Sequence, residues 1–433
     1  MTTGASLSAV SGILLVALAP VAGAQLVSMG TGGLVYQTYA NEGQGNAVHT
    51  LPDFSRAGYQ GGGVAIPFVP ARITLAPSGS DDTIAIQNAI DTVSALPVDP
   101  TGFRGAVVLT EGEFQVSDTL AITTGGVVVR GAGQQDGGGT RITFTAGSQS
   151  NLFEIRGNGG PATTGSGFAI TDPFVPVGSR TLNLTDASGF SPGDLIQITN
   201  LMNQKWIDDI GMDSSGVMGP DAWTPAGYQL KHFRFVESVT NNQLTLDSPI
   251  VQTIEDLYGG GIVQRASWSG ALENVGIEGI RMESTFASDT DEQHGWYAVT
   301  MHGVRNGWVR QVTSRYFGQG LVTISDRCMF VSVEDCAHLD PKSTTAGGNR
   351  YSFNIDDSSY ILFQRCLARD GRHDFVSGSQ TPGPNAFVDG LATAAQNDIG
   401  PHHRYSTGQI YDNIKTEENP NDADDAIRVQ NRT

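Results

Sequence analysis

The sequence of 433 residues predicts an all-β solenoid, in which short strands repeat along the chain and stack on one another. Three observations predict this fold class. Glycine is abundant, at 55 residues, and apolar residues make up 39% of the chain in many short runs. Alternation of apolar and polar residues with a period of two marks those runs as half-buried strands. A four-residue motif also returns along the chain, as internal repeats of solenoids do.

The repeated motif has an apolar residue at each end and mostly polar residues between them. Its five copies start 32, 24, 30 and 48 residues apart, at residues 277, 309, 333, 363 and 411. The last step is long enough for two coils. Because one coil is too small to bury its own apolar face, the coils must stack. Equivalent residues of neighbouring coils then lie about 4.8 Å apart.

Three cysteines occur, at positions 328, 336 and 366. An odd number argues against a disulfide framework, and the spacing does not match the paired ligands of a zinc site. Cys336 and Cys366 end successive copies of the repeated motif. We therefore expect two buried thiols stacked in one column, with no disulfide between them. The sequence predicts no defined metal site and no certain cofactor, although the acidic residues described below leave Ca²⁺ binding as an alternative.

Residues 1–24 are typical of a secretory signal peptide, with an apolar run that ends in the small residues Ala22-Gly23-Ala24 and cleavage before Gln25. A membrane-spanning helix needs about 20 apolar residues, whereas this run is shorter and contains Pro20. The expected location is extracellular or periplasmic, without a membrane anchor. Residues 25–77 form a leader segment.

Residues 78–175 are expected to form the first coils, opened by a helix over 79–93. The apolar residues of this segment are Ile84, Ile86, Ala89, Ile90 and Val93. Asp81 or Asp82 is placed to cap the helix at its start. Such a helix covers the open end of a stack and hides its apolar cross-section. Strand-like alternation follows in the segments GAVVLTEGEFQVSDTLAI and GGVVVRGAGQQDGGGTRITF.

Residues 176–250 interrupt the rhythm with longer strands and turn signals at Ser191-Pro-Gly-Asp and Asn241-Asn. We expect a small antiparallel β subdomain here, inserted between coils, and further coils over 251–433. The segment AIRVQNRT (426–433) begins another coil and then stops. An open solenoid end exposes strand edges. The expectation is a truncated product or a partner, such as a second copy, that covers this end.

The segments GSDDTIAIQNAID, GAVVLTEGEFQVSDTLAI and VVVRGAG…GGTRI resemble the N-terminal module of the pectate lyase superfamily. The resemblance covers about residues 78–145, and LPDFSRAGYQGGGVAIP (51–67) is similar to the leader of secreted members. It implies a single-stranded right-handed parallel β-helix that acts on a polysaccharide, usually an acidic one. It does not choose between lyase, hydrolase and epimerase chemistry. The catalytic signatures of polygalacturonases and of calcium pectate lyases are absent, so no catalytic residue can be carried over.

The charge distribution narrows the class of partner. Net charge is −19, yet residues 296–415 hold 11 Lys and Arg against 11 Asp and Glu, and five of the eight histidines. No basic run or basic-aromatic groove occurs, which argues against a nucleic acid partner. The locally neutral C-terminal part is therefore the expected region for an acidic polysaccharide.

Two short segments carry the residue types that β-elimination on a uronic acid requires. The reaction needs a group that neutralises the carboxylate, a base for the C5 proton and an acid for the leaving oxygen. Arginine suits the first role and histidine the others. The predicted catalytic residues are His373, Asp374, His402, His403 and Arg404, and the predicted substrate-binding residues beside them are Arg369, Arg372 and Asp398. The alternative is that these are polar loop residues that bridge coils.

The 29-residue separation of His373 and His402 is close to one coil step, which predicts that they are neighbours in space. His373 can be oriented by Asp374 or by Asp398. Everything in this interpretation depends on the two segments lying side by side and open to solvent.

A second group of candidates is a polar column formed by His302, Ser325, Asp356 and Asp389, with Asp326 and Asp357 alongside. Asp356 and Asp357 are predicted substrate-binding residues and can serve a glycosidase or bind Ca²⁺. The alternative is a ladder of turn-forming residues. Lys342 and Arg350, in the Gly-rich loop DPKSTTAGGNRY, are further candidates for substrate binding.

Three functions remain open from the sequence. The leading one is a polysaccharide lyase on a uronate-containing glycan, the second is a glycoside hydrolase, and the third is a non-catalytic glycan-binding β-helix.

Overall fold

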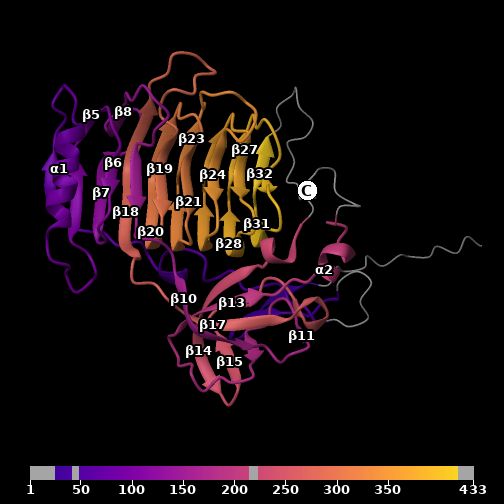
Figure 1. Cartoon of the computed structure of the whole chain (residues 1–433). Coiled ribbons are helices and arrows are strands. Elements are labelled where there is room, and N and C mark those ends of the chain that lie inside the picture. The colour runs from indigo at the N-terminus through magenta and orange to yellow at the C-terminus, as the bar shows by residue number, and fades with distance from the viewer. Residues whose placement is uncertain (1–24, 41–47, 214–222, 418–433) are drawn as a thin grey trace, which may run out of the picture. The chain divides into compact units, whose positions relative to one another are not determined.

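The structure is a computed structural model that describes residues 25–40, 48–213 and 223–417 (Figure 1). The predicted signal peptide and the segment 426–433 lie outside these ranges. In the ranges described, no helix is long and apolar enough to cross a membrane. The chain divides into two compact units, residues 1–51 and 52–433. In the first, β1 (Val27–Gly30) and β2 (Gly33–Tyr36) form an antiparallel hairpin.

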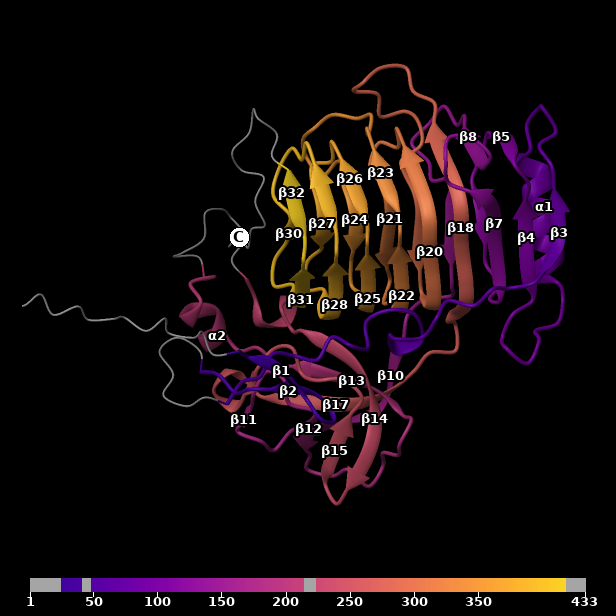
Figure 2. The ribbon, with the colours of Figure 1, turned by 180° about the vertical axis from the view of Figure 1, so that it is seen from behind.

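The second unit consists mainly of three parallel sheets, each built from one strand of every coil (Figures 1 and 2). Sheet I contains β3 (Ala71–Leu75), β4 (Gly105–Leu109), β7 (Val127–Gly133), β18 (Leu272–Ser284), β20 (Val304–Arg315), β22 (Met329–Glu334), β25 (Ser359–Gln364), β28 (Pro382–Val388) and β31 (Thr407–Asp412). Sheet II contains β5 (Gly112–Val116), β8 (Thr140–Phe144), the second halves of β18 and β20, β23 (Ala337–Leu339), β26 (Leu367–Arg369), β29 (Leu391–Thr393) and β32 (Lys415–Glu417). Sheet III contains β6 (Leu120–Ile122), β9 (Phe153–Arg156), β19 (Tyr297–His302), β21 (Gly320–Ser325), β24 (Tyr351–Ile355), β27 (His373–Ser377) and β30 (Gly400–Pro401).

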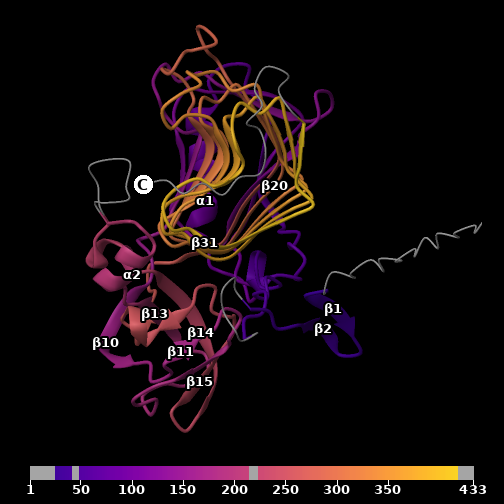
Figure 3. The ribbon, with the colours of Figure 1, turned by 90° about the vertical axis from the view of Figure 1, so that its right-hand side faces the viewer.

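From β4 to β30 the chain visits sheets I, II and III in the same order in every coil, so the strands stack in parallel register. The fold is a right-handed parallel β-helix, which confirms the predicted fold class. Figure 3 shows the coils nested one behind another.

The repeated motif marks one column of side chains in sheet I. Starting from Ile277, each motif's first residue pairs with the next in the parallel ladder, through Val309, Val333 and Phe363. Phe387 then pairs with both Phe363 and Tyr411. The 48-residue step therefore contains two coils, as expected. The three aromatic rings stack with centroids 5.0 and 4.7 Å apart.

The turn between sheets I and II explains the polar residues inside the motif. In successive coils Asp335, Arg365, Asp389 and Asn413 all have φ between 53° and 55°. Their backbone N–H groups continue the ladder, as when the N–H of Asp389 donates to the carbonyl of Asp412 at 3.0 Å. Asp389 thus belongs to this turn and not to the predicted column of His302, Ser325 and Asp356. The spacing along the chain alone did not distinguish the turn between sheets I and II from the turn between sheets III and I.

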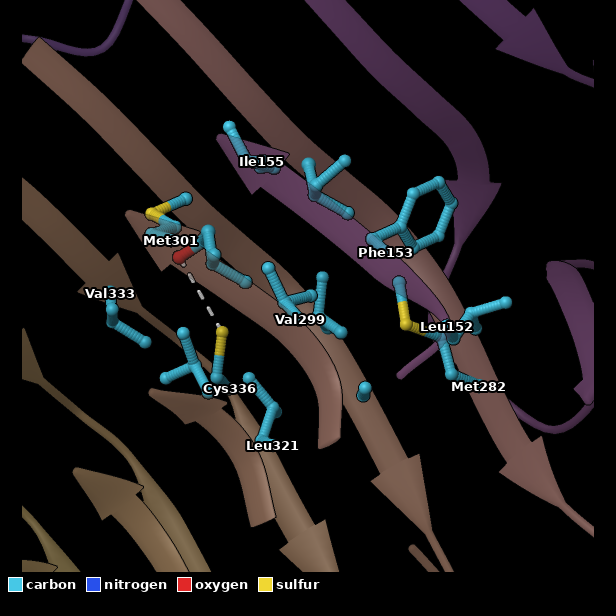
Figure 4. Packing of buried hydrophobic residues seen from close by; sticks show 14 of the residues in the cluster. Leu152, Phe153, Ile155, Met282, Val299, Met301, Leu321, Val333 and Cys336 are labelled. Carbon is cyan, nitrogen blue, oxygen red and sulfur yellow. Dashed lines mark hydrogen bonds between the residues drawn. The ribbon is translucent and has the colours of Figure 1, made fainter. Parts of the chain in front are cut away.

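Cys336 and Cys366 are buried, free thiols, as expected. The Sγ–H group of Cys336 donates to the carbonyl of Val309 at 3.5 Å, among the aliphatic side chains of the core (Figure 4). Burial raises the pKa of Cys366 to about 12, so this thiol stays protonated.

The helix α1 (Thr83–Ser94) packs against β3, β4, β6 and β7 and covers the first coils. Ile86, Ala89, Ile90 and Val93 are buried against the core, whereas Ile84 is 74% exposed and does not belong to this face. Ile84 comes two residues before Ile86, a rotation of about 200° around the helix, and therefore lies on the opposite face. The carboxylate of Asp81 accepts a hydrogen bond from the backbone N–H of Thr83 at 3.0 Å. It thus provides an acceptor for one of the N–H groups at the start of the helix that have no partner within the helix.

An antiparallel sheet interrupts the coils between β9 and β18. Its strands, in order, are β10 (Ala162–Ala169), β17 (Gly261–Ser267), β13 (Leu195–Asn200), β14 (Lys231–Thr240), β15 (Gln243–Leu246) and β12 (Thr181–Asn183). Smaller elements complete this unit and its surroundings: β11 (Phe174–Val175), β16 (Ile254–Glu255), α2 (Gln204–Asp209), and the short helices η1 (Tyr59–Gly61), η2 (Pro225–Gly227) and η3 (Asp256–Tyr258).

The inserted sheet extends beyond the expected range of 176–250, and the coils resume at Leu272. The strand β10 (ATTGSGFA) is almost wholly exposed. Its sequence therefore lacks the alternation of apolar and polar residues that identifies a half-buried strand. The insert packs on the coils through Phe233, which joins Met329, Phe330 and Tyr360 in one apolar cluster. The guanidinium of Arg234 also donates to the carbonyl of Gly383 at 2.9 Å.

Within the solenoid, the buried His338 on β23 predicts a dependence of stability on pH. Its side chain is 0% exposed, and its Nδ1 lies 2.7 Å from the hydroxyl of Ser314. Burial, and then the charge of Arg350, lower the pKa of His338 to about 3. An unfolded histidine has a pKa of about 6.5. The unfolded chain therefore takes up a proton that the folded chain does not, and stability falls as pH drops from about 6.5 towards 3.

We expect the His338→Asn variant, which keeps a partner for Ser314, to lose less unfolding free energy on acidification. Between pH 6.5 and 4.5, the slope of its unfolding free energy against pH should be shallower by up to about 1.4 kcal/mol per pH unit, which is the effect of one proton. Urea unfolding at several pH values measures this. The exposed His403→Asn variant should keep the wild-type slope, and an unchanged slope for His338→Asn would refute a neutral buried imidazole.

Candidate functional site

The predicted histidine pair lies where β27 and β30 run side by side. His373 opens β27, and His402 follows β30, with its N–H donating to the carbonyl of Ser377 at 3.0 Å. The centroids of the two imidazole rings are 3.8 Å apart. The structure therefore brings together the two segments that the coil spacing predicts to be neighbours.

The expected opening to solvent is not found. The side chains of His373, Asp398 and His402 are 0%, 2% and 4% exposed. The ring of Tyr351 packs edge-on against both imidazoles, with centroids 5.2 and 5.4 Å away. A general base must come within hydrogen-bond reach of a substrate proton. Enclosed rings do not offer that reach in this conformation, and the aromatic packing is the physical reason.

Of the two aspartates considered as partners of His373, Asp398 is the one that faces it. The Nδ1 of His373 lies 2.8 Å from the carbonyl oxygen of Asp398 and 3.7 Å from its carboxylate. Asp374 is also buried, but its carboxylate accepts the hydroxyl of Ser352 on the neighbouring strand. His403 is exposed beside His402, with ring centroids 4.3 Å apart, and Arg404 follows in the turn to β31.

Most of the predicted substrate-binding cations are engaged in ion pairs within the chain. Arg369 donates to both carboxylate oxygens of Asp340 at 2.8 Å. Arg350 is 6% exposed and lies 3.3 Å from Asp370. Lys342 lies 2.8 Å from Asp289. Arg372 is half-buried, and its backbone N–H donates to the carbonyl of Arg350. These residues hold the loops between sheets II and III in place.

An exposed group of carboxylates stands at the other end of sheet III, in the turns that lead back to sheet I. Asp326 follows β21, and Asp356 and Asp357 follow β24 in the next coil. Because Ile324 pairs with Ile355 in the ladder, the three acidic residues are neighbours. All three side chains reach solvent. We call Asp326, Asp356 and Asp357 the carboxylate group.

The members of the carboxylate group differ in their surroundings. The pKa of Asp356 is raised above its ordinary value, first by desolvation and then by the negative charges of Asp357 and Asp326. Desolvation also raises the pKa of Asp357, although Arg327, 3.4 Å away, opposes this. Asp326 lies 3.1 Å from the Nδ1 of His302 and 3.9 Å from the guanidinium of Arg156. The carboxyl of Asp356, with its raised pKa, thus lies beside that of Asp326, which has an imidazole and a guanidinium as neighbours.

The inserted sheet borders the carboxylate group. The guanidinium of Arg327 donates to the carbonyl of Pro161, at the start of the insert, at 2.8 Å. It also lies 5.8 Å from the ring of Phe233 on β14. Lys231, at the exposed start of β14, acts on the carboxyl of Asp357 through its charge. The site is therefore formed by two coils and by the insert, with several cations around three carboxylates.

Sequence reasoning found Asp356 and Asp357 but did not assign a role to Asp326, His302, Arg156 or Lys231. The polar column of His302, Ser325 and Asp356 was the sequence signal that pointed to His302 and to the neighbouring Asp326. Arg156 pairs with His302 in the ladder between β9 and β19, but the whole insert separates them along the chain. No local pattern connects residues across such an insertion.

No protein-family model and no curated protein matches the chain. A solved structure similar to it is the tailspike protein of Pseudomonas phage LKA1, at 14% identity and a TM-score of 0.43, over 77% of this chain and 52% of that one. The tailspike of Acinetobacter baumannii bacteriophage AP22, solved with a capsular saccharide, is 11% identical with a TM-score of 0.30; the match covers 80% of this chain and 65% of the tailspike. The endo-xylogalacturonan hydrolase of Aspergillus tubingensis is 10% identical with a TM-score of 0.29; the match covers 82% of this chain and 70% of the hydrolase.

The chain thus spans 52% and 65% of the two phage proteins. Its own strand pairing defines the fold independently of these likenesses, because successive coils from β4 to β30 each add a strand to three parallel sheets. The N-terminal segments that resemble the pectate lyase superfamily form the first coils and the helix α1 that covers them. The chain therefore folds as a single-stranded right-handed parallel β-helix, the fold that these N-terminal segments predict.

Proposed function

We propose that the protein is a secreted enzyme that cleaves a polysaccharide, and that it hydrolyses glycosidic bonds with the carboxylate group. One observation carries this proposal: exposed carboxyls from neighbouring coils lie together, and the pKa of Asp356 is raised. Glycoside hydrolysis uses two carboxyl groups, one protonated as general acid and one ionised as base or nucleophile. Partial desolvation of a carboxyl raises its pKa and thereby favours its role as the acid.

In the proposed mechanism Asp356 protonates the leaving oxygen of the glycosidic bond. Asp326 supplies the second carboxyl of the pair, which lies beside His302 and Arg156. Asp357 is held by Arg327 and keeps the pKa of Asp356 high. The exposed Arg156 and Lys231 supply positive charge beside the carboxylates, which suits a substrate with uronic acid units.

β-Elimination, the reaction that the sequence favoured, requires a base that reaches the C5 proton of a uronate. The imidazoles of His373 and His402 are enclosed and only His403 of the three predicted histidines is exposed, so the predicted acid and base are not both accessible and the geometry supports hydrolysis better. The likeness to phage tailspikes and to a pectin-type hydrolase is compatible with a glycan substrate, and the proposal rests on the carboxylate group.

A polysaccharide screen tests this function. The full chain is incubated with pectin, alginate, glucuronan, ulvan and a neutral xylan, and two signals are followed together. We expect new reducing ends on at least one substrate without the ultraviolet absorbance of unsaturated uronates. Absorbance that grows with the reducing ends would overturn hydrolysis in favour of β-elimination. Binding to a glycan without either signal would identify a non-catalytic binding protein.

A further inference from the structure

A buried polar group in the last coils is not used by the proposed function. It consists of His373, Asp398 and His402, whose side chains are at most 4% exposed. Polar and ionisable side chains lose their hydration when they are buried, so buried charges are found paired or bound to metals. Two imidazoles and one carboxylate in one place also form a set of donors that transition metals prefer.

The distances within this group are compatible with a shared cation. One ligand atom from each of the three residues lies within 4.8 Å of the others. A tetrahedral zinc ion holds its ligand atoms about 3.3 Å apart. The three ligand atoms must therefore approach one another by at most about 1.5 Å to bind one ion, and side-chain rotations supply movements of this size.

The hydrogen bond of His373 orients its ring as metal ligands are oriented. A carbonyl oxygen only accepts, so the Nδ1 of His373, 2.8 Å from the carbonyl of Asp398, carries the proton. The lone pair is then on Nε2. Metal-binding histidines commonly donate the other ring N–H to a backbone carbonyl, which fixes both the tautomer and the orientation of the ring. Here the residue that supplies this carbonyl also supplies the carboxylate.

We propose that His373, Asp398 and His402 bind a divalent transition-metal cation of the zinc class, a site that the sequence did not predict. Two nitrogen donors and one carboxylate match Zn²⁺, whereas Ca²⁺ requires six to eight oxygen ligands. The ion joins the strand β27 to the turn after β30 and thereby ties two successive coils together. Its role is independent of the carboxylate group, which lies in the turns at the other end of sheet III.

The expected consequence is a metal-dependent stability of the solenoid. The folded chain presents all three ligands together, and the unfolded chain does not, so the metal stabilises the folded state. We therefore expect the melting temperature of chelator-treated protein to rise when Zn²⁺ is added, and to be unaffected by the same concentration of Ca²⁺.

Equilibrium dialysis of the chelated, full-length protein against Zn²⁺, with metal quantified by mass spectrometry, tests the site. About one equivalent is expected to bind to wild type, and Co²⁺ should give the visible absorption of a nitrogen- and oxygen-ligated ion. The nearly isosteric Asp398→Asn and the His402→Gln variants should each bind about 100-fold more weakly or worse. Circular dichroism checks that these variants fold.

Matched controls are His302→Gln and His403→Gln, which remove a half-buried histidine beside an aspartate and the immediate neighbour of His402. Both should keep wild-type affinity. The proposal is overturned if no stoichiometric Zn²⁺ binds, if folded Asp398→Asn and His402→Gln bind as tightly as wild type, or if the control variants lose affinity equally. Loss of hydrolysis in carboxylate-group variants leaves these binding results unchanged, so the two proposals fail separately.

Discussion

Polysaccharide hydrolysis by the Asp356→Asn variant is expected to fall by a factor of about 10² to 10³, the usual contribution of a general acid. An amide has the size and shape of the carboxyl but cannot donate its proton to the leaving oxygen. The full pH profile of the reaction, measured on the best substrate from the screen, provides the sharper readout. Wild-type activity should decline as pH rises through the raised pKa of Asp356, because only the protonated form acts as the acid. The variant should lose this alkaline limb.

The matched control for this prediction is Asp389→Asn. Asp389 is exposed and occupies a turn with φ of 53°, a conformation that asparagine adopts readily. It lies in the turns between sheets I and II, so the same chemical change should leave hydrolysis unaltered. Asp326→Asn should also reduce activity, because it removes the second carboxyl of the proposed pair. If Asp356→Asn retains more than half of wild-type activity, Asp356 is not the acid.

The Phe387→Ala variant is expected to lose about 3 to 5 kcal/mol of unfolding free energy. The ring of Phe387 is 0% exposed and lies between the rings of Phe363 and Tyr411 in the aromatic column of sheet I. Removing it forfeits the burial of the ring and leaves a cavity that coils of a regular stack cannot close. Urea unfolding, followed by circular dichroism, measures the difference.

Phe68→Ala serves as the control for the aromatic column. Its side chain is 76% exposed and lies 4.0 Å from the guanidinium of Arg130. Loss of a single exposed cation–π contact should change stability by about 1 kcal/mol or less. Equal effects of the two substitutions would mean that the stacked column is not a main source of stability. A change in the denaturant slope would indicate that the C-terminal coils unfold separately.

Local sequence patterns were sufficient for the solenoid and for its register. Alternation identifies strands because each inward side chain is apolar, and a repeat identifies coils because stacking places equivalent residues in one column. Ile277 and Tyr411 were assigned to the same column from spacing alone, and the ladder confirms it. The proximity of His373 and His402 follows from the same rule. The exposed strand β10 was missed because it buries nothing and thus carries no alternation.

Spacing along the chain does not determine which side chains reach solvent. The sequence brought His373 next to His402, but the packing of Tyr351 against both rings encloses them and turns a predicted catalytic pair into a proposed metal site. The neighbourhood of Asp326, Arg156 and the inserted sheet also depends on contacts between residues far apart in the chain. Such contacts are decided when coils and insert pack together, since only then are particular groups desolvated. The sequence by itself therefore determined the stack and its columns, and the tertiary structure decided which polar residues are available for chemistry.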